Sequence, residues 1–79
     1  MKQQEYIIHV RERCETKTSQ MLDVLGIEHL LPFKSVEIDG IYHLVLSQNG
    51  IIYARFNIEI IEKILALPYV IDIALANKD

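Results

Sequence analysis

The side chains of this chain that are able to do chemistry include three histidines, one cysteine and eleven acidic residues. Zinc sites use such residues in close pairs. The chain shows no close pair among its candidates, which are His9, Cys14, His29 and His43. No serine lies beside a base, and neither a P-loop nor a dinucleotide-binding glycine motif is present. We therefore expect no metal site, no cofactor and no catalytic residue, and the chain is predicted not to be an enzyme.

Charge and hydropathy narrow the range of partners. Eleven acidic and eight basic residues give a net charge of −3, and they are scattered, with no basic stripe to neutralise phosphates. The first apolar run is too short for a signal peptide, and no segment approaches the ~20 apolar residues of a membrane span. The single cysteine excludes an internal disulfide and fits a reducing compartment. We expect a cytoplasmic protein that binds neither nucleic acid nor a membrane.

The first third of the chain is predicted to form a strand and a helix. Strict alternation in EYIIHVR predicts a strand with one apolar face. In ETKTSQMLDVLGIE the apolar residues recur at helical spacing, with Thr16 or Thr18 as the expected N-cap. Gly26 is placed to end this helix, so that Ile27 packs back on Leu22 in a Schellman motif. The HLLPF segment that follows is predicted to be a connector, because proline cannot donate to a strand ladder.

Two turn signals, Asp39-Gly40 and Asn49-Gly50, divide the middle of the chain. A three-residue loop ending at Gly50 keeps every core-side pair apolar. It predicts the cross-strand pairs Leu46 with Ile52, Leu44 with Ala54, and Tyr42 with Phe56. The Asp39-Gly40 signal is compatible either with a second hairpin, whose three-residue loop pairs Val36 with Tyr42, or with a bulge in one long strand.

The last third of the chain predicts a helix and a strand. Asn57 is the expected N-cap of IEIIEKILAL, whose buried stripe is Ile58, Ile61, Ile64 and Leu65, and Pro68 ends it. YVIDIAL then alternates as a strand. The resulting β-α-β-β-α-β order predicts a single α+β domain over residues 1–79. This is a ferredoxin-like sandwich with two helices on one face of an antiparallel sheet and room for one extra strand.

The sheet face without helices is the predicted site. Its outward positions mix polar with apolar side chains, and an apolar patch on a small protein marks a contact surface. The residues expected on this docking face include Ile41, His43, Val45, Tyr53 and Arg55. We therefore predict a non-enzymatic protein-interaction module whose partner is another protein or a second copy of itself.

Three stretches of the chain resemble the subtilisin propeptide-like protease inhibitors. They are the opening strand YIIHVRER, the glycine–aromatic strand IDGIYHLVLS, and the helix, proline and strand of IEKILALPYVIDIAL. The resemblance implies a ferredoxin-like inhibitor or chaperone that docks its open sheet face on a subtilisin-like protease. It also implies that the C-terminal tail, Ala76, Asn77, Lys78 and Asp79, lies in the substrate cleft.

Two other functions fit the same pattern. If Gly40 lies in a bulge, the chain looks equally like a small ACT-like regulatory domain, which forms homo-oligomers or senses a ligand through its sheet. The opposing class is an enzyme or small-ligand sensor built at a dimer interface around His9, His43 and Arg55. The sequence leaves these alternatives open.

Overall fold

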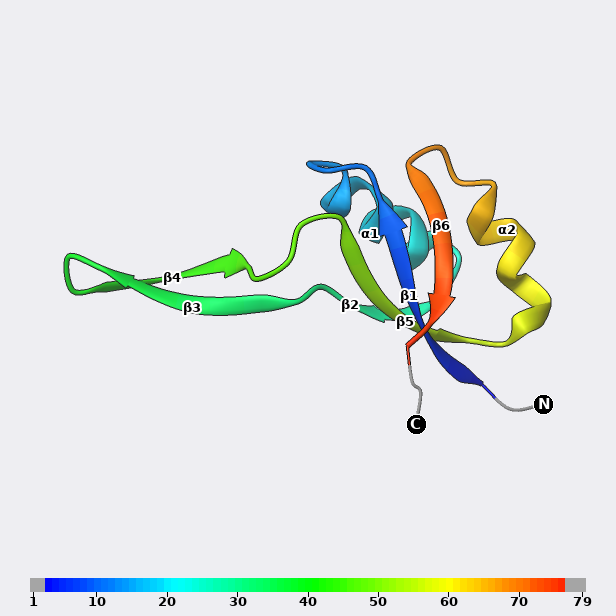
Figure 1. Cartoon of the computed structure of the whole chain (residues 1–79), viewed down its shortest axis with the longest axis horizontal. Helices are drawn as coiled ribbons and strands as arrows, with labels where there is room; N and C mark the ends of the chain where they lie inside the picture. The colour runs from blue at the N-terminus through cyan, green and yellow to red at the C-terminus, as the bar shows by residue number, and fades with distance from the viewer. Residues whose placement is uncertain (1–2, 77–79) are drawn as a thin grey trace.

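The structure, a computed structural model, describes residues 3–76 of the chain. These residues form an α+β fold with two antiparallel sheets and two α-helices (Figure 1). The strands are β1 (Gln4–Val10), β2 (Glu28–Leu30), β3 (Phe33–Ile38), β4 (Ile41–Leu46), β5 (Ile51–Phe56) and β6 (Val70–Leu75). The helices are α1 (Glu15–Val24), the short 3-10 helix η1 (Ile58–Ile60) and α2 (Ile61–Leu65). The described residues thus have six strands where the sequence predicted four or five.

The larger sheet has the strand order β2-β5-β1-β6, and every neighbouring pair is antiparallel. The alternation predicted for the first strand is confirmed, because Tyr6, Ile8 and Val10 are all buried. Tyr6 stacks on Phe56 of β5 with the ring centroids 4.3 Å apart. The rest of the buried apolar core comes from both helices and their flanking strands, at Leu22, Ile27, Ile52, Ala54 and Ile64.

Helix α1 ends as predicted but begins differently. The N–H groups of Gly26 and Ile27 donate to the carbonyls of Asp23 and Leu22, which is the Schellman pattern, and Ile27 joins the core. The N-cap is Cys14 rather than a threonine. Thr18 lies inside the helix, fully buried, and its hydroxyl donates back to the Cys14 carbonyl at 2.9 Å.

The segment predicted to be a connector contains a strand. β2 pairs with β5, with Glu28 opposite Arg55 and Leu30 opposite Tyr53. Three residues are too few for alternation to be visible in the sequence, so only the partner strand defines β2. Pro32 follows it and, as expected, stands outside both sheets.

The predicted pairing of residues 42–46 with residues 52–56 is wrong. β4 pairs instead with β3 across a two-residue turn at Asp39-Gly40, where φ is +53° and +78°. Asp-Gly with positive φ at both positions is favoured in such hairpins, because this turn matches the strand twist. The hairpin alternative for Gly40 is therefore correct, although its register places His43, not Tyr42, opposite Val36.

The chain returns from this hairpin through residues 47–50, and hydrogen bonds fix both ends of that loop. Ser47 donates its backbone N–H and its hydroxyl to the Pro32 carbonyl, at 2.6 and 2.9 Å. Gly50 donates to the buried Glu15 carboxylate at 2.6 Å and accepts from the Val10 N–H at 2.9 Å. The root of the hairpin is thus tied to β1 and α1.

The C-terminal helix is shorter than predicted. Asn57 is the N-cap residue of η1, as predicted, but its side chain makes no capping hydrogen bond, and its Oδ1 is buried without a partner among the described residues. Ile64 is fully buried, whereas Ile58 and Leu65 of the predicted stripe are exposed. Ile61 of the predicted stripe packs against the core, and Ile60 and Leu67 do so in place of the two exposed residues. β6 then pairs with β1 along the edge of the sheet.

Candidate functional site

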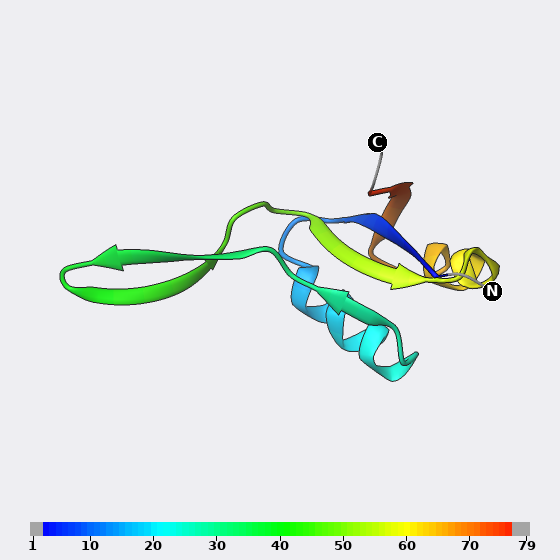
Figure 2. The same cartoon turned by 90° about the horizontal axis from the view of Figure 1, so that it is seen from below.

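The β3–β4 hairpin, residues 33–46, stands away from the rest of the molecule, and we call it the arm (Figures 1 and 2). Its large apolar side chains are mostly solvent-exposed. Tyr42 is 71% exposed and Leu44 is 72% exposed. Other exposed apolar residues of the arm are Phe33, Ile38, Ile41 and Val45. Contiguous exposed apolar surface on a small protein is typical of interaction sites, so the arm is the first candidate site.

Both faces of the arm carry apolar side chains among a few polar ones. Residues that are paired across antiparallel strands share a face. One face carries the pairs Phe33–Leu46, Ser35–Leu44 and Glu37–Tyr42. We call it the aromatic face. The other face, the β-branched face, carries the pairs Lys34–Val45, Val36–His43 and Ile38–Ile41. Neither face is covered by any other described element.

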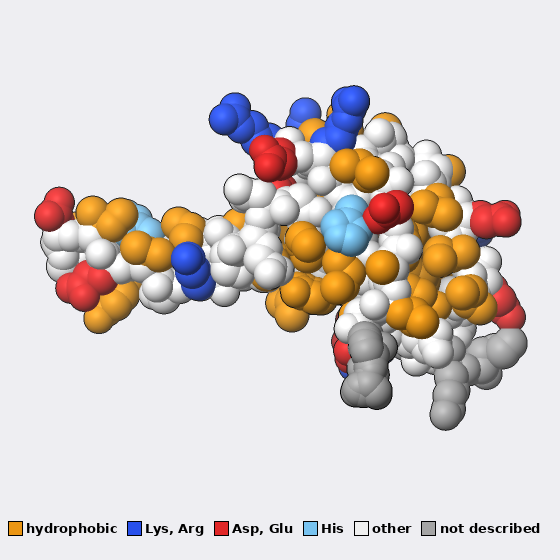
Figure 3. Space-filling view, viewed as in Figure 1, with side chains coloured by type: hydrophobic (Ala, Val, Ile, Leu, Met, Phe, Trp, Pro, Cys, Tyr) orange, Lys and Arg blue, Asp and Glu red, His pale blue; other side chains and the backbone are white. Residues whose placement is uncertain are grey.

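The larger sheet has its own uncovered side, opposite the core, which we call the open face. It faces the viewer in Figure 3, where hydrophobic side chains are seen over the sheet and along the arm. Ile7 and Tyr53 are half-buried on this side. His9 and Asp72, on neighbouring strands, approach to 2.7 Å through Nδ1 and Oδ1. The open face is therefore a mixed surface, with polar pairs set among apolar groups.

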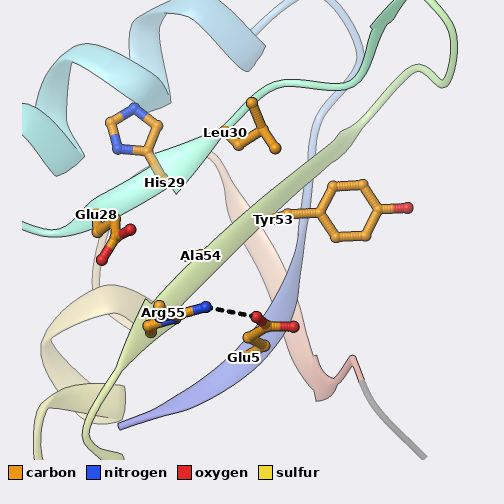
Figure 4. Close-up of a pocket in the computed structure, with 7 residues that line it drawn as sticks. All are labelled: Glu5, Glu28, His29, Leu30, Tyr53, Ala54 and Arg55. Carbon is orange, nitrogen blue, oxygen red and sulfur yellow. Dashed lines mark hydrogen bonds and ion pairs between the residues drawn. The ribbon is translucent and has the colours of Figure 1, made fainter.

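A hollow of about 320 Å³ lies on the open face, between β2, β5 and β1 (Figure 4). Its lining residues are Glu5, Glu28, His29, Leu30, Tyr53, Ala54 and Arg55. Arg55 donates to the Glu5 carboxylate at 2.8 Å across the hollow. This hydrogen bond, with the nearby charge of Glu28, raises the pKa of the Arg55 guanidinium. The hollow offers apolar walls and one half-exposed ion pair.

The structure separates the predicted docking residues into two groups. Tyr53 and Arg55 lie on the open face of the larger sheet. Ile41, His43 and Val45 lie on the β-branched face of the arm and not beside them, because β4 pairs with β3 and not with β5.

The predicted C-terminal tail is described only at its first residue. Ala76 donates its N–H to the Glu5 carbonyl at 3.0 Å, which continues the pairing of β6 with β1. Asn77, Lys78 and Asp79 lie outside the described residues.

One polar pair was not anticipated from the sequence. Ser19 and His29 approach to 2.6 Å through Oγ and Nε2, and Nδ1 of His29 lies 2.9 Å from the Ile27 carbonyl. If the His29 ring donates from Nδ1 to the Ile27 carbonyl, then Nε2 accepts a hydrogen bond from the Ser19 hydroxyl. The pair joins α1 to β2, and only the three-dimensional fold brings these two residues together.

No protein-family model matches this chain, and a search of curated proteins found no match. Within residues 3–76, no three histidine, cysteine or acidic side chains are grouped to hold a metal ion. No helix in this part of the chain is long and apolar enough to cross a membrane. The arm and the open face are the two candidate sites that the geometry of the described residues provides.

Proposed function

We propose that this chain is a non-enzymatic protein-interaction module that docks through the arm. The observation that carries the proposal is a two-stranded sheet with large apolar side chains exposed on both faces. A lone hairpin is marginally stable in water, and it gains stability when a further surface covers its apolar groups. A protein surface is the covering that suits an arm with apolar faces and few charges.

The exposed surface area and the radius of gyration are both larger than those of a compact domain of this length, as expected for an uncovered arm. The chain exposes 5664 Å² of surface, whereas a compact monomer of 9.2 kDa exposes about 4,900 Å². Its radius of gyration is 13.7 Å, against about 12 Å for a compact domain of this length. The arm is the element that extends the molecule along its longest axis (Figure 1).

We further propose that the larger sheet and its helices form a ferredoxin-like unit into which the arm is inserted. When only the strands of that sheet are counted, β1-α1-β2 and β5-α2-β6 are two interleaved β-α-β units. This order corresponds to the split β-α-β arrangement. The arm then occupies the connection between the two units, where an insertion leaves the core unchanged. A cytoplasmic location, suited to a lone reduced cysteine, belongs to the same proposal.

A subtilisin propeptide-like inhibitor is the second candidate. The open face favours it, because Tyr53 and Ile7 are available there for docking on a protease. A panel of subtilisin-like proteases tests it. An inhibitor gives slow, tight loss of activity that weakens when Ala76 to Asp79 are removed, and no inhibition of any protease excludes this candidate.

Site-specific photo-crosslinking tests docking through the arm. The photoreactive residue p-benzoylphenylalanine replaces Tyr42 on the arm, or Val24 on α1 as a matched control, since both are strongly exposed. The proposal predicts a discrete protein adduct from position 42, formed in cells that express the chain and absent from position 24. Adducts at neither position, or equally at both, would overturn docking through the arm.

A further inference from the structure

We infer that the arm is covered by the arm of a second copy of this chain, packed aromatic face to aromatic face about a two-fold axis. The inference rests on the proposed function and names its partner. In a two-fold interface the same patch lies on both sides and must complement itself. The arms then run antiparallel, and the tip of each arm lies over the root of the other.

The order of residues on the aromatic face suits this arrangement. Leu44 and Ser35 form the middle pair, Phe33 and Leu46 lie at the root, and Glu37 and Tyr42 lie toward the tip. Antiparallel packing sets each Tyr42 over the apolar root of the partner's arm and brings the two Leu44 side chains together at the axis. The two Glu37 carboxylates are kept apart at opposite ends, so no like charges meet.

Charge complementarity supports the same partner. The tip of the arm is acidic, with Glu37 before the turn and Asp39 in it. The loop that joins β1 to α1 carries a net positive charge, because Arg11 and Arg13 are exposed on either side of an exposed Glu12. This loop lies beside the root of the arm, because residue 50 bonds both Val10 and Glu15 at its two ends. A tip that reaches the partner's root therefore brings its carboxylates toward these arginines.

The extra surface that the extended chain exposes is comparable with the area that one partner of a dimer contributes. The chain exposes roughly 700 Å² more than a compact monomer of its mass. Each partner in a standard-size interface contributes about 800 Å². The aromatic face includes the two most exposed side chains of the arm's apolar set, Tyr42 and Leu44.

Cysteine crosslinking with a short bismaleimide tests the arrangement in the purified full chain. A spacer is needed because facing sheets lie about 10 Å apart, whereas a direct disulfide requires Cα atoms within about 7 Å. A Cys14→Ser background removes the native thiol, and Leu44→Cys then places one cysteine at the expected axis. His43→Cys is the matched control, because it is the adjacent residue on the opposite face of the same strand. With this reagent we expect at least about tenfold more covalent dimer from Leu44→Cys than from His43→Cys, because only the thiols on the aromatic face lie opposite each other across the interface.

The possible outcomes distinguish failure of the arm-to-arm dimer from failure of the proposed docking function. Equal trapping at both positions, or trapping only at His43→Cys, would overturn packing through the aromatic face. A protein that stays monomeric would overturn the second copy as partner. The proposed function would still stand in that case if Tyr42 photo-crosslinks to a different protein, and it fails only if position 42 gives no specific adduct.

Discussion

The backbone N–H of Gly50 donates a 2.6 Å hydrogen bond to the carboxylate of Glu15, a side chain buried in the first turn of α1. These residues are far apart in the sequence, and their contact fixes the loop that returns from the arm to the sheet. The arm itself has no such support, since its strands pair only with each other in the described residues. The molecule therefore combines a firmly tied root with an uncovered arm.

Loss of the Glu15 carboxylate is expected to destabilise the domain. Glu15→Ala leaves the buried N–H of Gly50 without its charged acceptor, which costs about 2 kcal/mol of unfolding free energy. For a domain of this size that lowers Tm by roughly 8–16 °C. Chemical denaturation followed by circular dichroism measures the loss. Glu12→Ala, at an exposed position, is the control, and an equal effect of both variants would contradict the assigned role of Glu15.

Alanine variants of two glycines measure the cost of the close approach between residue 50 and the Val10 backbone. Gly26 and Gly50 both have φ of +74°, but a Cβ at residue 50 meets the Val10 carbonyl oxygen at 2.9 Å, and a Cβ at residue 26 meets nothing. Gly26→Ala is expected to cost about 1 kcal/mol from backbone strain alone. Gly50→Ala adds a steric cost of about 1 kcal/mol or more. Thermal unfolding of both variants measures the difference, and equal losses would contradict the close approach.

The different locations of Phe56 and Tyr42 predict different mutational effects. Phe56 is buried and stacked on Tyr6, so Phe56→Leu should lower the unfolding free energy by about 1–2 kcal/mol. Tyr42→Leu should leave it unchanged in dilute solution, because the Tyr42 ring is exposed on the arm. Urea titrations at low protein concentration compare the two variants. A comparable loss from Tyr42→Leu would indicate that this ring is packed within its own chain.

The larger sheet is expected to fold without the arm. Ser47 already bonds the Pro32 carbonyl, so replacing residues 33–46 by Asn-Gly closes a short hairpin at that point. The unfolding free energy should change by less than about 1 kcal/mol, since no core residue is removed. Heteronuclear NMR of the shortened chain checks this. Loss of dispersed signals from β1 and β5 would mean that the arm is part of the folding unit.

Local sequence signals predicted the elements that bury a regular face. Alternation in β1 and the Schellman motif after α1 depend on neighbouring residues, so they could be read from the chain. The pairing of β4 could not. Tyr42, Leu44 and Leu46 alternate as core residues do, and both candidate registers kept the apolar side chains on one face. Only tertiary structure distinguishes a strand that covers the core from one whose apolar side chains are exposed to solvent.

Only part of the candidate site was predicted, because local signals place β5 correctly but do not determine the pairing of β4. Tyr53 and Arg55 were assigned to the open face and lie there, because β5 alternates around the buried Ile52, Ala54 and Phe56. The arm residues were assigned to that face through the wrong strand pairing. The hollow around Arg55 also depends on β2, a strand too short to be recognised from its sequence.

The absolute mass of the chain in solution, measured by light scattering over a concentration series, tests the central claim most directly. We predict a dimer of about 18 kDa, twice the 9.2 kDa chain. Leu44→Asp should raise its dissociation constant at least about 100-fold, because the charge is buried at the axis in both copies. His43→Asp, on the opposite face, should change it far less. A wild-type chain that remains at 9.2 kDa across the series, or a dimer indifferent to Leu44→Asp, would contradict arm-to-arm assembly.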